Sequence, residues 1–97
     1  MTRKEHRDYR EEEKANIVVS GEDLQGHAFE EQTESIDISS SGIAFYLNTF
    51  IGPRSFISID LSQSKEFGYI GKVSAVVVRV EIASYEKEKH LVAAEFI

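Results

Sequence analysis

Residues 33–47 read Thr33-Glu-Ser-Ile-Asp-Ile-Ser-Ser-Ser-Gly-Ile-Ala-Phe-Tyr-Leu47. The run from Thr33 to Ile38 and the run from Ile43 to Leu47 alternate as half-buried strands do. Asp, Ser and Gly between them favour a tight polar turn, because their side chains bond nearby backbone and glycine accepts positive φ. The stretch Asp37–Gly42 therefore either simply joins two strands or, with its carboxylate, hydroxyls and N–H groups, holds a polar ligand.

Other strand-like runs extend along the chain in both directions from this turn. We predict strands at 15–20, 27–38 (one long strand or two), 42–47, 56–61, 69–83 and 91–97. No segment shows sustained 3.6-residue periodicity, and several short strands between turns are typical of an all-β sandwich or barrel. A barrel is favoured because closure removes exposed sheet edges.

The alternation also predicts which side chains share a face. Three predicted sets have alternate members: Ile43, Phe45 and Leu47; Ile57, Ile59 and Leu61; Val92, Ala94 and Phe96. In the same way Ile36 is expected to share a face with Ile38. In the longest run one face is expected to carry Val76, Val78, Val80 and Ile82.

The chain divides into a charged arm, residues 1–14, and a barrel domain, residues 15–97. Tyr9 is the one large apolar side chain after Met1 in the arm, so the arm has no face to bury. Its basic residues are Arg3, Lys4, Arg7, Arg10 and Lys14, mixed with acids. The arm is expected to be flexible, and is either a solvated terminus or a segment whose arginines close over an anion.

Composition limits the classes of function. The 11 Lys and Arg against 17 Asp and Glu give a net charge of −6, which disfavours a general nucleic-acid binder, including single-strand binding on an OB-like barrel. No apolar run is long enough for a membrane-spanning helix, and no signal peptide or cysteine is present. We therefore expect a cytoplasmic protein without membrane insertion.

Catalytic and metal chemistry have little support. The three histidines, His6, His27 and His90, lie in unrelated settings, and neither a nucleophile motif nor metal-ligand spacing is present. We expect no enzyme and no cofactor. The arm's arginines and the Asp37–Gly42 turn do suit a guanine nucleotide, because guanidinium binds phosphate and guanine while a carboxylate accepts from guanine N–H groups.

Two short motifs resemble those of PilZ domains, the receptors for the bacterial second messenger cyclic di-GMP. Asp37, Ser39 and Gly42 fit the family's (D/N)-x-S-x-x-G, and Arg3 and Arg7 fit its R-x-x-x-R ahead of the first strand. If the motif is placed by its distance from Gly21, Arg10 rather than Arg7 is the second arginine. The sequence therefore leaves two alternatives open, a pair ending in Arg7 and a pair ending in Arg10. Val92-Ala93-Ala94-Glu95-Phe96 also resembles the family's closing strand.

The resemblance implies a six-stranded antiparallel PilZ-type barrel of split, Greek-key-like form. It implies a cyclic di-GMP receptor whose ligand contacts come from Arg3, Arg7 or Arg10 together with Asp37, Ser39 and Gly42. Ligand binding would order the arm, and a fused domain or a protein partner would sense this. The alternative is a PilZ-like protein-interaction module that has lost the nucleotide.

Overall fold

The computed structural model describes residues 14–84 and 89–97. These residues form six β-strands. They are β1 Asn16–Glu22, β2 Ala28–Ile38, β3 Gly42–Leu47, β4 Phe56–Asp60, β5 Lys72–Ser84 and β6 Lys89–Phe96. A single turn of 3-10 helix, Gly68–Ile70, lies between β4 and β5. The region 27–38 is thus one strand rather than two. The predicted arm, residues 1–14, lies outside the described residues except for Lys14.

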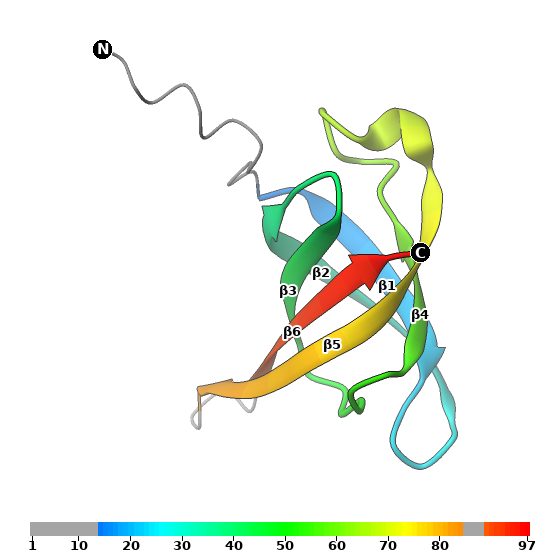
Figure 1. Ribbon diagram of the computed structural model, residues 1–97, viewed down its shortest axis with the longest axis vertical. Helices are drawn as coiled ribbons and strands as arrows, with labels where there is room; N and C mark the ends of the chain where they lie inside the picture. Colours follow the sequence, from blue (N-terminus) through cyan, green and yellow to red (C-terminus); the bar gives the residue numbers. More distant parts are fainter. Residues whose placement is uncertain (1–13, 85–88) are drawn as a thin grey trace.

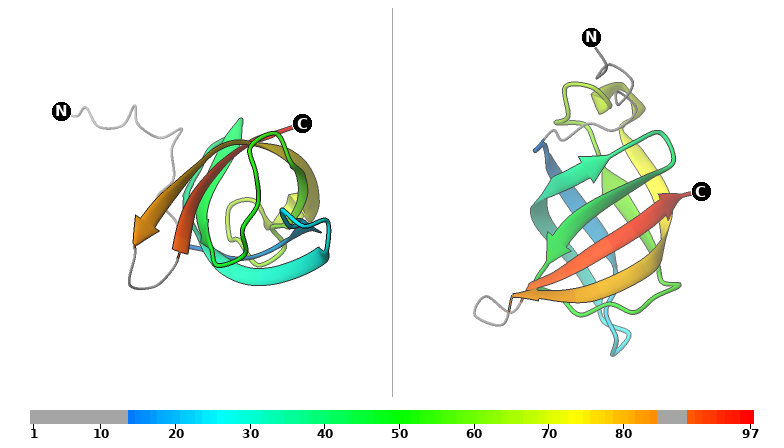
Figure 2. Two further views of the ribbon diagram at one scale, coloured as in Figure 1. Left: turned by 90° about the horizontal axis from the view of Figure 1, so that it is seen from below. Right: turned by 60° about the vertical axis from the view of Figure 1, so that its left-hand side comes forward.

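The strands close into an antiparallel barrel in the order β1-β2-β3-β6-β5-β4 (Figures 1 and 2). This confirms the predicted all-β, six-stranded antiparallel barrel. Since β3 and β4 are not neighbours, the connection between them crosses one end of the barrel, at the bottom of Figure 1. The β2–β3 turn and the start of β1 lie at the opposite end.

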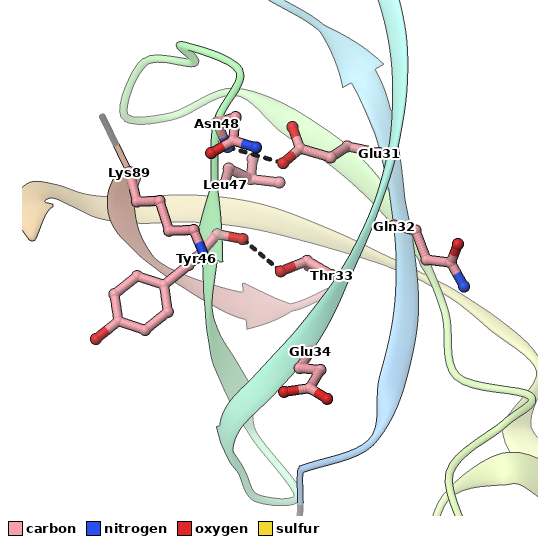
Figure 3. A pocket seen from close by; sticks show the side chains of 8 residues that line it. All are labelled: Glu31, Gln32, Thr33, Glu34, Tyr46, Leu47, Asn48 and Lys89. Atoms are coloured by element: carbon pink, nitrogen blue, oxygen red, sulfur yellow. Dashed lines mark hydrogen bonds between the residues drawn. The ribbon is translucent and has the colours of Figure 1, made fainter. Parts of the chain in front are cut away.

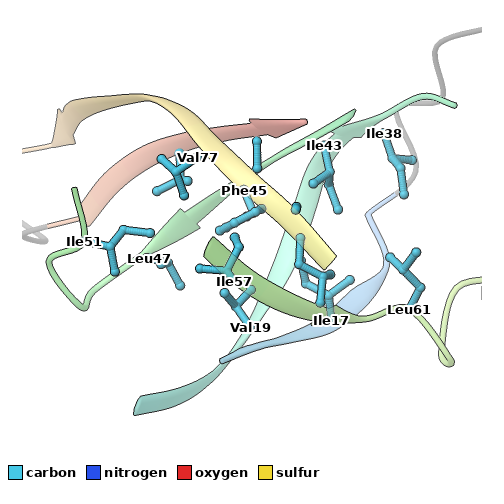
Figure 4. Packing of buried hydrophobic residues seen from close by; sticks show 14 residues of the cluster. Ile17, Val19, Ile38, Ile43, Phe45, Leu47, Ile51, Ile57, Leu61 and Val77 are labelled. Atoms are coloured by element: carbon cyan, nitrogen blue, oxygen red, sulfur yellow. The ribbon is translucent and has the colours of Figure 1, made fainter. Parts of the chain in front are cut away.

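Alternate residues of the strands fill the barrel interior (Figure 4). Phe45 of β3 is the largest fully buried side chain, and Ile59 of β4 and Val92 of β6 are equally inaccessible. Each of the three sets predicted to share a face does so: all their members are buried except Phe96, which is half-buried against the same core. Alternation predicts these strands well because each keeps an unbroken period of two.

Two predicted faces are wrong, each because of a β-bulge. Between Ser35 and Asp37 the register of β2 shifts, so that Ile36 is an extra residue and Ser35, rather than Ile36, is buried together with Ile38. A second shift lies between Val77 and Arg79 of β5. A bulge moves the following side chains to the other face, as an extra residue must in a period of two.

The second bulge splits the predicted face of β5. Val77 is buried, whereas Val78, the extra residue, is exposed, with 49% of its surface accessible. Ile82 pairs with the buried His90 and so lies on the same side as Val80, but it is 66% exposed toward the end of the strand. Val80 packs against the core from beyond the bulge. The core side of β5 is therefore built from Val73, Ala75 and Val77 before the bulge and from Val80 after it. The predicted pairing of Val80 with Ile82 on one side holds, but Val76 and Val78 do not share that side.

The β1–β2 connection is a hairpin turn built on Asp23. Its Oδ1 atom accepts hydrogen bonds from the N–H groups of Gln25 and His27, each at 2.9 Å. The Asp23 carbonyl accepts from Gly26 at 3.0 Å, and Gly26 has φ +84°, a conformation that favours glycine. These bonds, that from His27 foremost, hold the pKa of the Asp23 carboxyl below its ordinary value.

This lowered pKa predicts an acid-sensitive hairpin. A carboxyl whose folded pKa is depressed adds stability above its unfolded pKa and loses it as pH falls through the folded pKa. Between pH 5 and pH 3, wild type is therefore expected to lose more stability in urea unfolding than Asp23→Asn, in which this titration is absent. Equal losses in the two proteins would contradict the role given to this carboxylate.

Candidate functional site

Ser39 organises the turn between β2 and β3. Its Oγ atom accepts hydrogen bonds from the backbone N–H groups of Ser41 and Gly42, each at 3.3 Å. Its own N–H donates to the Gly42 carbonyl at 2.9 Å. Serine favours turns because its hydroxyl competes locally for backbone groups in this way. The motif serine thus has a structural task within the turn.

Gly42 is required by the close approach of β6. A Cβ atom at this position would lie 2.6 Å from the carbonyl oxygen of Ala94. The φ of Gly42 is not positive, so the expectation that glycine is needed for its conformational freedom is wrong. The turn is also tied to the end of β6, since the N–H of Phe96 donates to the Ser41 carbonyl at 2.9 Å.

Asp37 and Arg79 lie at opposite ends of one row of residues on the outer surface. Successive cross-strand pairs join Asp37 to Ala44, Ala44 to Ala93 and Ala93 to Arg79. The row crosses β2, β3, β6 and β5, which run side by side in the right-hand view of Figure 2. Three strand spacings separate the backbones of Asp37 and Arg79 by about 14 Å.

The two alanines leave a shallow depression between these charged side chains. Its volume is about 210 Å³, and its lining consists of Asp37, Ser39, Gly42, Ile43, Ala44, Arg79 and Ala93. Each charged residue comes directly after a bulge, at Ile36 in β2 and at Val78 in β5. Bulges commonly re-aim side chains next to functional sites. Here they place an acid and a base on one face.

Arg79 is the site residue that the sequence analysis missed. Its Nε atom lies 3.0 Å from Oε2 of Glu81, and both side chains are more than half exposed. Such a surface ion pair contributes only about 0–1 kcal/mol, so an anionic ligand displaces it at low cost. In the sequence Arg79 stands alone in an apolar run, and nothing in that run indicates that β5 lies near the turn.

The predicted arm residues Arg3, Arg7 and Arg10 lie outside the described residues. The start of β1 is nevertheless fixed beside β2: the N–H of Ala15 donates to Ser35 Oγ at 3.2 Å, and the N–H of Ser35 donates to the Ala15 carbonyl at 2.9 Å. The start of β1 therefore lies at the same end of the barrel as the Asp37–Gly42 turn (Figure 1). The structure thus brings Asp37, Ser39 and Gly42 together.

Metal-ion clusters and membrane-spanning helices are both absent from the described residues. Within 14–84 and 89–97, no three His, Asp or Glu side chains are grouped to hold a metal ion. The same residues contain no helix with the length and apolar character needed to cross a membrane.

Comparison with known proteins identifies the architecture. No family model and no curated protein sequence matches the chain. Among solved structures, Bacillus subtilis MotI/DgrA, an inhibitor of motility, superposes with a TM-score of 0.64 over 92% of this chain at 19% identity. K. pneumonia MrkH, solved in complex with c-di-GMP, covers 100% of this chain with a TM-score of 0.60 at 18% identity.

The chain has a PilZ-type fold. The apo form of MrkH gives the same TM-score of 0.60 and the same 18% identity. The chain spans 40% of the length of MotI/DgrA and 45% of that of MrkH. At these identities the likeness establishes the PilZ-type barrel alone.

Proposed function

We propose that this domain is a non-catalytic receptor for cyclic di-GMP. The observation that carries the proposal is the row from Asp37 to Arg79, with its alanine floor, directly beside the motif turn. The c-di-GMP complex of MrkH, a protein with the same type of fold, supports this choice of ligand. The messenger is a cyclic dianion with two flat guanine bases and two phosphates.

Opposite ends of the row match opposite ends of a guanylate unit. The Asp37 carboxylate accepts hydrogen bonds from the N1–H and N2–H groups of guanine. The Arg79 guanidinium donates to a phosphate or to the O6 and N7 edge of a guanine. Ala44 and Ala93 between them let a flat base approach the sheet, since neither side chain extends beyond Cβ. Ser39 and Gly42 keep the turn in place at the rim.

The arm arginines complete the proposed site. Arg10, Arg7 and Arg3 precede Lys14 by four, seven and eleven residues. At roughly 3.3–3.6 Å per extended residue, the backbone spans about 14, 25 and 40 Å at most. All three are therefore close enough in sequence to contact a ligand held beside the turn. Binding would order the arm, and the domain would pass this change to a fused domain or a protein partner in the cytoplasm.

Calorimetric titration with cyclic di-GMP tests the proposal. Wild type is expected to bind, and each of Arg3→Ala, Arg7→Ala and Arg10→Ala tests one arm contact. The two substitutions that lower the affinity identify the pair of arginines that contacts the ligand. Absence of heat with wild type, together with unchanged amide resonances at the turn, would overturn the receptor role in favour of a PilZ-like protein-interaction module without nucleotide.

Arg79→Ala is expected to weaken cyclic di-GMP binding about tenfold or more, because a hydrogen bond to a charged group contributes about 1.5–3 kcal/mol. Arg54→Gln is the matched control. It removes the same charge from the connection between β3 and β4, at the barrel end away from the turn (Figure 1). If the two variants lose affinity equally, the effect is one of net charge and Arg79 is not a contact.

A further inference from the structure

One edge of β2 is open although the barrel is closed. The upper part of β2, Ser35–Ile38, pairs with β3, whereas residues 28–34 have β1 as their one paired strand in the part of the chain that the structure describes. The N–H of Ser35 points to β1, where it donates to Ala15. Because backbone groups alternate along a strand, those of Glu30 and Gln32 point away from β1, toward the open side.

The split between β2 and β3 is bridged by side chains from the inner face of β2. Thr33 Oγ1 donates to the Tyr46 carbonyl at 2.8 Å. The Glu31 carboxylate accepts from the N–H groups of Asn48 at 2.8 Å and Thr49 at 3.0 Å. Figure 3 shows Glu31 and Thr33 reaching from β2 toward β3. These bridges satisfy backbone groups of β3 but leave those of Glu30 and Gln32 facing the split.

A depression of about 270 Å³ lies over these bridges. Its lining consists of Glu31, Gln32, Thr33, Glu34, Tyr46, Leu47, Asn48 and Lys89. It is small and open compared with small-molecule pockets, which usually measure about 300–1,000 Å³ and enclose their ligand. Exposed backbone donors and acceptors along an open strand are instead what an added strand recognises.

Charge decides which added strand fits. Glu30 and Glu34 stand four residues apart on the exposed outer face of β2. A second copy of this strand would place glutamates opposite glutamates, which disfavours self-pairing. A strand with Lys or Arg at two positions four residues apart would place a cation opposite each carboxylate, since residues i and i+4 of a strand share a face.

We propose that the open edge of β2 binds an extended segment of a protein partner that carries two basic residues four positions apart. The segment pairs with the backbone of Glu30 and Gln32 and lies over the Glu31 and Thr33 bridges. This site is separate from the Asp37–Arg79 row and does not depend on the proposed nucleotide binding.

Amide hydrogen exchange tests the proposal on the full chain without nucleotide. The probe is the capped peptide Thr-Lys-Thr-Val-Thr-Lys-Thr, followed by NMR at low salt. At saturation, hydrogen exchange at the backbone amides of Glu30 and Gln32 is expected to slow at least tenfold. Exchange at the backbone amides of Glu31 and Thr33 is expected to change little, because their N–H groups already point toward β1. No perturbation up to millimolar peptide, or a perturbation without this alternation, would overturn strand addition.

Charge reversal tests the recognition. The double variant Glu30→Lys with Glu34→Lys is expected to bind the lysine peptide about tenfold more weakly at low salt, and to bind the peptide with glutamate in place of lysine better than wild type does. The matched control, Glu66→Lys with Glu95→Lys, makes the same change in net charge at exposed positions that are not paired with residues 28–34. Equal losses in both double variants would refute the proposed pairing.

Discussion

Replacing Gly42 by alanine is expected to lower the free energy of unfolding by roughly 1–3 kcal/mol, the usual cost of forcing extra atoms into a packed site. The added Cβ would lie 2.6 Å from the Ala94 carbonyl oxygen, and this neighbour is backbone, which cannot rotate away. Either β3 and β6 separate at this point or the turn shifts. Urea unfolding measures the loss.

Gly52→Ala is the matched control for this effect. A Cβ there would meet the flexible end of the Leu24 side chain at 3.2 Å, and the φ of Gly52 is not positive. A change of less than about 1 kcal/mol is expected. Gly42→Ala with wild-type stability would contradict the close approach. The motif glycine thus has a structural reason, so loss of ligand binding in Gly42→Ala alone would not establish a ligand contact.

Asp37→Ala is expected to weaken cyclic di-GMP binding roughly tenfold to a hundredfold, because the guanine edge loses hydrogen bonds to a charged acceptor. Asp37 is half-buried at the end of the row and follows the bulge at Ile36. Asp37→Asn keeps one acceptor oxygen but replaces the other with a donor, so it is expected to lose most of this affinity as well. Calorimetry measures both variants.

Ser40→Ala serves as the control within the same turn. Ser40 is exposed and lies outside the lining of the depression. It should bind as wild type does, and far-UV circular dichroism should show the same β-sheet signal for all variants. Wild-type affinity in Asp37→Ala would remove this residue from the site, whatever the other variants show.

The sequence predicts the strands that keep one period throughout. Ile43, Phe45 and Leu47 alternate without interruption, and so do Ile57, Ile59 and Leu61, and all are buried as expected. The bulges at Ile36 and Val78 could not be predicted, because a bulge is a relation between two paired strands. No glycine or proline stands at or next to Ile36 or Val78 to mark the irregularity in the sequence.

The same limit explains what was missed at the site. The turn was found because Asp37, Ser39 and Gly42 are close together in the sequence. Arg79 lies 42 positions after Asp37 and meets it across three strand pairings and two bulges. That juxtaposition depends on register, which the sequence of one strand does not specify. The requirement for Gly42 likewise comes from β6, a strand remote in the chain.

The central claim is that cyclic di-GMP binds beside the Asp37–Gly42 turn. A titration of wild type followed by NMR tests ligand and location together. The predicted result is saturable shifts in the amides of Ser39, Ser41 and Gly42 and in those of Arg79 and Ala93 across the row, with shifts in the arginines of residues 1–14. Saturable shifts confined to other strands, or none at millimolar nucleotide, would contradict the account.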